Sequence, residues 1–157
     1  MKNRKCLTLF FVICYLFLGT SFLSAQTAER MEKLLEQNRV SYKDAALMVL
    51  EASGRLDAEK QTSADDAFTF AMERGWLPKN AQANGDAKLG GLSLLLVQAF
   101  EIKGGALFSL FKNPHYAYRV MVYKGIIQGR TDPQMTVSGD LLLYTVNRAL
   151  GVMNDDE

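Results

Sequence analysis

The segment YKGIIQGRTDPQMTVSGDLLLYTVNRALG, Tyr123–Gly151, joins a glycine turn, a proline-bearing loop and an apolar stretch. Gly125 and Gly129 can adopt positive φ where a helix ends and the chain turns. Pro133 blocks continuation of a helix through the loop, and Ser138 is a good N-cap for a following helix. The segment therefore predicts a helix, a glycine turn, a loop and a second, capped helix.

The chain beyond residue 25 carries the same helical periodicity, with apolar residues recurring every three or four positions. We expect five or six helices in an all-α fold. In the segment SYKDAALMVLEASG, Ser41 and Asp44 have the spacing of a capping box, and Gly54 can end the helix. Gly75 closes a later helix in the same way. The stretch 92–102 is apolar on nearly every side, which predicts the buried central helix of a bundle.

The first 25 residues have the pattern of a secretory signal peptide. Lys2, Arg4 and Lys5 precede an apolar run that is shorter than a membrane span, and small polar residues follow up to Ala25. We expect cleavage after Ala25 and a location in the periplasm or cell envelope; an uncleaved N-terminal anchor is the alternative. Both cysteines of the chain lie inside this segment, so no disulfide and no thiol chemistry is expected in the mature chain.

Beyond the signal peptide, 15 Lys and Arg residues stand against 17 Asp and Glu residues. This near balance lacks the basic footprint of phosphate binding, so we expect no nucleic-acid partner. The length fits one helical domain, residues 26–153, followed by an acidic tail at residues 154–157. No later apolar run is long enough to cross a bilayer, so no membrane span is expected in the mature chain.

The sequence offers no recognisable catalytic set. His115 is the one histidine of the chain, which excludes a metal site built from several histidines and weakens any catalytic triad; we expect it at a surface or cap. A helix start explains the neighbouring carboxylates Asp65 and Asp66, and the glycines in KLGGLS lack the preceding strand of a phosphate loop. We expect a protein that is not an enzyme and holds no metal or cofactor, with a small envelope hydrolase as the remote alternative.

Three segments of 15 residues align with their apolar positions in step. They are VSYKDAALMVLEASG, LGGLSLLLVQAFEIK and VSGDLLLYTVNRALG, opened by Val40, Leu89 and Val137. Gly54 and Gly151 close the first and third segments, and Gly104 follows the second. We expect Leu95 and Leu143 to be buried at equivalent positions. A helix and a glycine turn precede the second and third segments, which predicts a compact bundle of helix–turn–loop–helix repeats around one core.

These residues resemble the S-layer homology domain. The KGIIQG turn, the loop with Asp132 and Pro133, and the helix ending in Arg-Ala-Leu-Gly are similar to the family's motifs. The likeness extends over Tyr116–Met153, is weaker over Asp65–Lys103 and is weakest before Gly54. The resemblance implies a three-unit, all-helical spindle that binds an anionic cell-wall polysaccharide.

The chain departs from the family at the Thr-Arg-Ala-Glu motif, whose Arg is implied in polysaccharide binding because its planar fork pairs with anions. The matching residues are Ser41, Tyr42, Lys43 and Asp44, then Gly90, Gly91, Leu92 and Ser93, then Ser138, Gly139, Asp140 and Leu141. No unit keeps the Arg. Lys43 can act as a point charge beside a helix N-terminus, so binding of a wall glycan stays open.

The candidate binding residues lie at turns and helix starts. They are Tyr42, Lys43, Arg74, Trp76, Lys124 and Arg130. We expect Tyr42 and Lys43 to face outward, and Trp76 to be partly exposed just beyond its glycine turn. Lys124 and Arg130 flank the glycine turn of the opening segment. The five aromatic residues at positions 108, 111, 116, 118 and 123 have helical spacing. This spacing favours burial in the core over the alternative that they line a groove for a sugar or peptide.

These observations favour a non-enzymatic, exported envelope protein. We expect a binding or structural module that acts as an adaptor or accessory subunit of an envelope protein complex. The missing Arg favours an envelope protein as the partner, and a cell-wall glycan or peptidoglycan anchor is the alternative.

Overall fold

The computed structural model describes residues 29–56, 62–129 and 131–155. The chain divides into two compact units, residues 1–36 and 37–157. In the first unit, residues 29–35 form a helix. The expected signal peptide, residues 1–25, lies outside the described residues.

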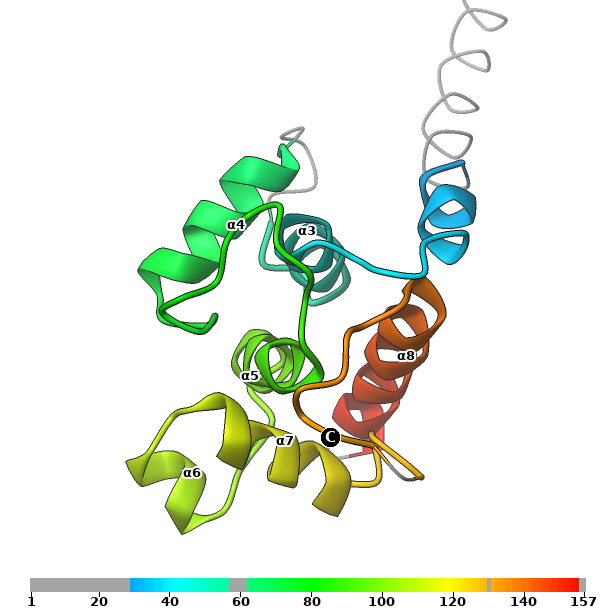
Figure 1. The fold of residues 1–157 in the computed structure, drawn as a ribbon. Coiled ribbons are helices and arrows are strands. Elements are labelled where there is room, and N and C mark those ends of the chain that lie inside the picture. Colours follow the sequence, from blue (N-terminus) through cyan, green and yellow to red (C-terminus); the bar gives the residue numbers. More distant parts are fainter. Residues whose placement is uncertain (1–28, 57–61, 130, 156–157) are drawn as a thin grey trace, which may run out of the picture. The chain divides into compact units, whose positions relative to one another are not determined.

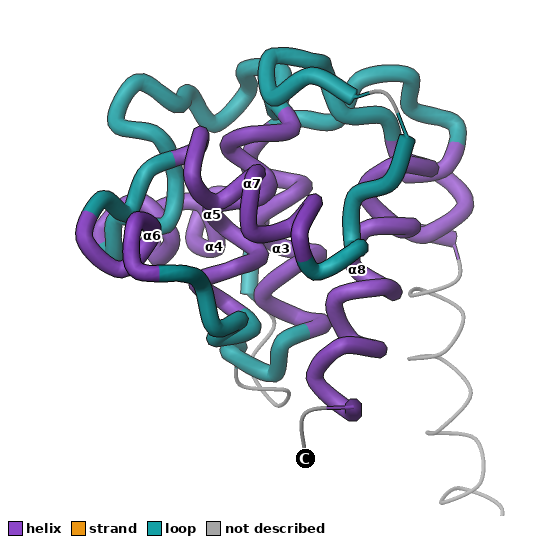
Figure 2. The backbone as a smooth tube through the Cα atoms, turned by 90° about the horizontal axis from the view of Figure 1, so that it is seen from below, coloured by secondary structure: helices purple, strands orange, loops and turns teal. Residues whose placement is uncertain are grey.

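The second unit is built from helices joined by turns and loops (Figure 1). They are α3 (Tyr42–Ala52), α4 (Ala64–Glu73), α5 (Leu89–Ala99), α6 (Ala106–Leu110), α7 (Pro114–Tyr123) and α8 (Gly139–Asp155). No strand occurs among the residues that the structure describes, which confirms the all-α prediction. Figure 2 shows the longer loops gathered along one side of the helices. Because α8 continues to Asp155, the first half of the expected acidic tail is helical.

Helix α5 is the central element of this unit, as predicted. Every residue of α5 is buried except Gln98, and the helix packs against α7 on one side and α3 on the other (Figure 1). Removing leucine side chains from water in this way stabilises the fold by roughly 1.5–3 kcal/mol each. Leu95 is fully buried, but Leu143 on α8 is only half-buried, so the prediction of equivalent burial is wrong for Leu143.

Four helices end with the same backbone arrangement. The residue after the C-cap has positive φ, and the N–H of the next residue donates to a carbonyl five positions back. The residues with positive φ are Gly54 (φ 64°), Gly75 (φ 67°), Glu101 (φ 53°) and Gly125 (φ 71°). The prediction that Gly104 and Gly151 close the second and third segments is wrong. Glu101 ends α5 before Gly104 is reached, and Gly151 lies inside α8.

Polar side chains cap most of the helix starts. The Ser41 hydroxyl accepts a hydrogen bond from the Asp44 N–H at 3.2 Å and donates to the Asp44 carboxylate at 2.6 Å. Ser138 accepts from the Leu141 N–H at 3.3 Å, as predicted. Pro114 lies in the first turn of α7, where its missing N–H costs nothing.

A closed ring of three backbone hydrogen bonds joins the chain just before α3, α5 and α8. The Ala87 N–H donates to the Val40 carbonyl at 2.8 Å, the Val137 N–H donates to the Ala87 carbonyl at 2.9 Å, and the Val40 N–H donates to the Val137 carbonyl at 2.9 Å. All three residues are fully buried. Leu89 was expected to open the middle segment, but the residue in the ring is Ala87, two positions earlier.

Candidate functional site

Tyr42 is buried rather than outward-facing, so that prediction is wrong. Its side chain is 7% exposed, and its phenol oxygen accepts a hydrogen bond from the Lys88 N–H at 3.2 Å. The ring occupies the space left by Gly91, where an added Cβ would lie 2.5 Å from the phenol oxygen. Burial raises the pKa of Tyr42, and the hydrogen bond from Lys88 lowers it by less. Tyr42 therefore joins α3 to the start of α5.

Lys43 already has partners within the fold. Its ammonium lies 3.6 Å from an Asp65 carboxylate oxygen, and its side chain is 27% exposed. Its backbone N–H donates to the carbonyl of Ala83 at 3.1 Å. The pairing neutralises the charge that was expected to attract an anion.

The first backbone N–H groups of α3, α5 and α8 are already hydrogen-bonded to loop carbonyls. In α3, the Tyr42 N–H donates to the Gly85 carbonyl at 3.0 Å. In α5, the Leu89 N–H donates to the Met135 carbonyl at 2.9 Å. The first amide of α8, that of Gly139, donates to the Gln37 carbonyl at 2.9 Å. A helix N-terminus binds an anion through free amides, so these three starts are poorly suited to that role.

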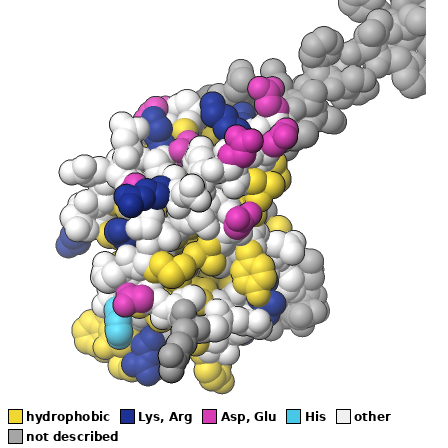
Figure 3. All heavy atoms as spheres, turned by 45° about the vertical axis from the view of Figure 1, so that its right-hand side comes forward, with side chains coloured by type: hydrophobic (Ala, Val, Ile, Leu, Met, Phe, Trp, Pro, Cys, Tyr) yellow, Lys and Arg dark blue, Asp and Glu magenta, His cyan; other side chains and the backbone are white. Residues whose placement is uncertain are grey.

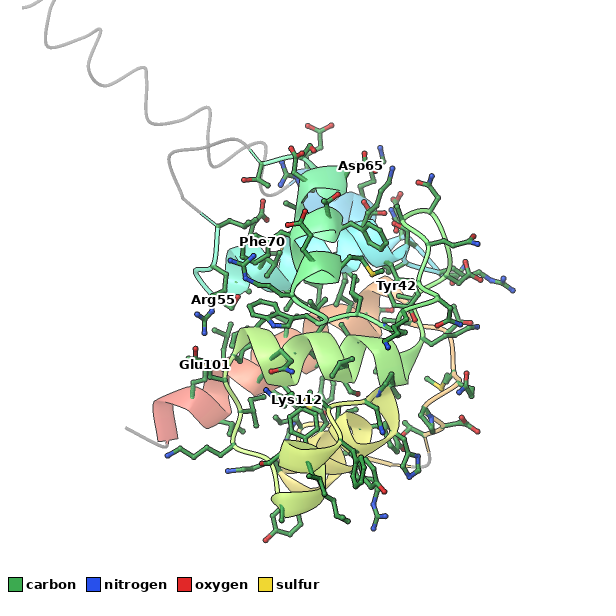
Figure 4. All side chains as sticks on the ribbon, turned by 90° about the vertical axis from the view of Figure 1, so that its left-hand side faces the viewer. Tyr42, Arg55, Asp65, Phe70, Glu101 and Lys112 are labelled. Atoms are coloured by element: carbon green, nitrogen blue, oxygen red, sulfur yellow. The ribbon has the colours of Figure 1, made fainter. Side chains whose placement is uncertain are left out.

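The residues around the Gly75 turn form a stacked cluster. The Arg74 guanidinium lies 3.6 Å from the centre of the Phe70 ring, and the Trp76 ring meets Phe70 edge-on at 5.8 Å. Trp76 is half-buried, as expected, and Arg74 is exposed. Figure 4 labels Phe70 on α4. Stacking of this kind contributes to local stability, and a binding role for Trp76 stays a prediction.

Of the two candidate cations beside the last glycine turn, Lys124 and Arg130, the structure describes only Lys124. Lys124 is half-buried and forms the C-cap of α7. Arg130 lies outside the described residues. The turn between them has Gly125 and Gly129 at φ 71° and 83°, as the sequence predicts.

One groove, of about 210 Å³, lies at the start of α5. All three prolines of the chain, Pro78, Pro114 and Pro133, line it. Polar groups reach it from Asn80, His115 and Gln134, three side chains on separate loops and helix starts. Gly90 and Gly91 keep the groove open, since a Cβ at Gly90 would lie 3.2 Å from the Pro133 carbonyl oxygen. Lys88 also lines the groove, and its ammonium donates a hydrogen bond to the Thr136 hydroxyl at 2.8 Å. Rigid apolar walls with a few polar groups suit a small polar ligand.

A larger groove, of about 530 Å³, lies between α6 and α7. Apolar side chains from both helices line it, and Lys103 and Arg119 add cationic groups. The aromatic residues of this region were predicted as core. Phe108 is buried, whereas Phe111 is 50% and Tyr123 is 89% exposed. The prediction is therefore wrong for Phe111 and Tyr123, because each lies at the C-terminal end of its helix, Phe111 as the C-cap of α6 and Tyr123 as the last residue of α7.

The described part of the chain holds no cluster of three or more side chains suited to a metal ion. None of the helices that the structure describes is both long and apolar enough to span a bilayer. The carboxylates of Asp65 and Asp66 pair with Lys43 and with the Ser63 cap of α4, respectively. His115 is exposed in the first turn of α7, as expected. No protein-family model, curated protein or solved structure matches the chain.

Proposed function

We propose that the chain is a non-enzymatic, exported binding module of S-layer-homology type that serves as an adaptor or accessory subunit for an envelope protein complex. The observation that carries the proposal is a set of exposed apolar residues on α6 and α7. We call Leu107, Leu110, Phe111 and Tyr123 the α6–α7 surface; each side chain is at least half exposed. Exposed apolar patches on soluble domains commonly mark protein-binding sites.

Three members of this surface lie in or beside one groove. Leu107 and Tyr123 line the groove together, and Phe111 stacks on Tyr116, a further lining residue, with ring centres 6.0 Å apart. Aromatic side chains are enriched at the buried centres of protein interfaces, where they supply large apolar area, and exposed leucines beside them extend that area. The surface thus has the composition of a contact site rather than of a solvated helix face.

The hydrogen-bonded ring supports three repeated units. If Val40, Ala87 and Val137 are equivalent, then Gly54 and Glu101 both follow their ring residue by the same spacing and share positive φ. The second repeat then comprises the leading helix α4 and the ring-linked helix α5, and the third repeat comprises α7 and α8. In this scheme α6 falls between two units. Helix α6 is therefore an insertion between repeats, and its exposed apolar residues would be explained by a partner that binds this chain specifically.

Capture of a partner by purified chain from solubilised native envelope tests the proposal. The double variant Leu110→Ser, Tyr123→Ser should lose the captured protein by about tenfold or more, because interface anchors contribute about 2 kcal/mol or more. Both side chains are exposed, so the variant should keep its thermal unfolding midpoint. Tyr144→Ser on α8 is the matched control, since Tyr144 is also exposed; Figure 3 shows apolar side chains emerging in the middle of the face that carries α8. Equal capture by all three proteins would contradict the proposal.

A second candidate function, docking to a wall glycan, is supported by the proline-lined groove at the start of α5. The purified chain would then sediment with protein-free cell-wall sacculi, and His115→Ala or Gln134→Ala would reduce sedimentation. Lys43→Ala should have little effect because Lys43 is paired with Asp65. Salt-sensitive sedimentation that depends on Lys43 would instead favour an anionic glycan bound at the start of α3. A substrate screen of the same protein tests the remote alternative of a small hydrolase.

A further inference from the structure

The α6–α7 groove is formed by a stretch of the chain in which every Lys, Arg, Asp or Glu position is a Lys or Arg. Residues 102–131 include five Lys or Arg residues, and all 17 Asp and Glu residues of the protein lie elsewhere. The acid nearest before this stretch, Glu101, is held by Arg55 at 2.6 Å; Figure 4 shows the two side chains together at one end of α5. The two charged residues that line the groove, Lys103 and Arg119, are therefore both cations, although the whole chain is close to neutral.

The groove combines this charge with an apolar lining. Phe108 and Val120 are almost fully buried in its lining, and Leu107 and Tyr123 are exposed beside them. Lys103 comes from the segment before α6 and Arg119 comes from α7, so each of the two groove-forming segments supplies one cation. An apolar side chain can enter such a groove while carboxylates on the same ligand meet the two cations.

We infer that the α6–α7 groove binds an acidic peptide segment of a partner protein, with a leucine or aromatic anchor inserted between α6 and α7 and its Asp or Glu side chains on Lys103 and Arg119. This inference rests on the proposed adaptor function and names the chemistry of the partner. Charge complementarity favours an acidic partner because opposite potentials steer association and exclude basic competitors. The concave lining favours a peptide over a flat lipid surface, because a side chain fills the groove.

Selection of short random peptides on the immobilised full chain tests the inference. Selected peptides should carry Asp or Glu beside a leucine or aromatic residue, and their affinity should fall with rising salt. Arg119→Glu should weaken binding by about tenfold, the effect of replacing an exposed attraction with a repulsion. Lys79→Glu is the matched control, because Lys79 is an exposed cation that does not line the groove, and it should leave the affinity unchanged.

Selected peptides that are basic or uncharged, or that bind Arg119→Glu as well as the wild type, would overturn the inference. So would binding of the chain to phosphatidylglycerol vesicles, dependent on Arg119, when no acidic peptide is selected; that outcome assigns the surface to a membrane. If acidic peptides fail but envelope capture still depends on Leu110 and Tyr123, only the inference falls and the adaptor proposal stands. If Arg119-dependent acidic peptides are selected but no envelope protein is captured, the adaptor proposal falls.

Discussion

The phenol oxygen of Tyr42 accepts a hydrogen bond from the Lys88 N–H at 3.2 Å, and the same side chain lies over Gly91. This contact links the first residue of α3 to the residue just before α5. It also explains the glycine at position 91, near a helix start, where glycine lowers helix propensity. A side chain at Gly91 would displace the phenol, so the glycine is required by packing rather than by phosphate binding.

Gly91→Ala should destabilise the chain by about 1–2 kcal/mol. Overpacking against Tyr42 costs about 1–3 kcal/mol, and the better helix propensity of Ala offsets part of it. Gly151→Ala is the control, because Gly151 lies inside α8 with no atom within 4 Å of an added Cβ. It should stabilise by about 0.5–1 kcal/mol. Urea denaturation measures both, and a Gly91 variant as stable as the wild type would refute the packing argument.

Glu101→Gly should leave stability unchanged or raise it by up to about 1 kcal/mol. Glu101 holds φ 53°, a conformation that costs a residue with a side chain roughly 1–2 kcal/mol. The lost ion pair with Arg55 is worth less, because the Glu101 side chain is 75% exposed. Gly125→Ala, at the corresponding position after α7, should instead cost about 1 kcal/mol. Thermal unfolding of the two variants must show opposite or clearly unequal shifts; a large loss in Glu101→Gly would mean that the ion pair dominates.

Tyr42→Phe should cost about 1 kcal/mol at neutral pH, because the Lys88 N–H loses its acceptor. Burial raises the Tyr42 pKa above its ordinary value of 10.0. The folded chain thus retains the phenol proton more strongly than the unfolded chain. This contribution to stability is complete below about pH 10 and is lost as the pH rises through the folded pKa. Urea denaturation at about pH 8 and about pH 11 should show a smaller alkaline loss in Tyr42→Phe than in the wild type.

An identical alkaline loss in both proteins would show that Tyr42 does not titrate with a raised pKa. The other five tyrosines of the chain are common to both proteins, so the difference isolates Tyr42.

Leu95→Ala should cost about 2–5 kcal/mol, because Leu95 is fully buried in α5 and its removal leaves a cavity. Leu143→Ala should cost about 1 kcal/mol, because the side chain is only half-buried. Urea denaturation compares the two. Equal large losses would support the original alignment of these positions rather than the register set by the hydrogen-bonded ring.

Local sequence signals predicted local structure well. Ser41 and Ser138 begin helices, Gly54, Gly75 and Gly125 end them, and the apolar α5 is buried. These features depend on neighbouring residues, because a cap bonds an amide three positions away and a left-handed turn needs only a missing Cβ. The predictions from the sequence were wrong where two nearby residues were both suited to the same position. Glu101 took the turn conformation that Gly104 was expected to take, and Ala87 rather than Leu89 entered the ring.

The candidate site was predicted less well than the fold. Tyr42 was expected outside because it follows a cap, and it lies inside because Gly91, far along the chain, leaves room for its ring. Phe111 and Tyr123 were expected inside because their spacing is helical, and they are exposed because α6 and α7 have no further helix beyond them in the described chain. Spacing shows which residues share a helix face, but not whether anything covers that face.

The sequence by itself determined the all-α class, the caps, the glycine turns and the central position of α5, since each follows from contacts within a few residues. Only the tertiary structure decided the register of the ring of Val40, Ala87 and Val137, the burial of Tyr42 and the exposure of the α6–α7 surface. The ring and the burial of Tyr42 depend on segments far apart in the sequence, where backbone amides find partners and side chains find space that no local pattern encodes.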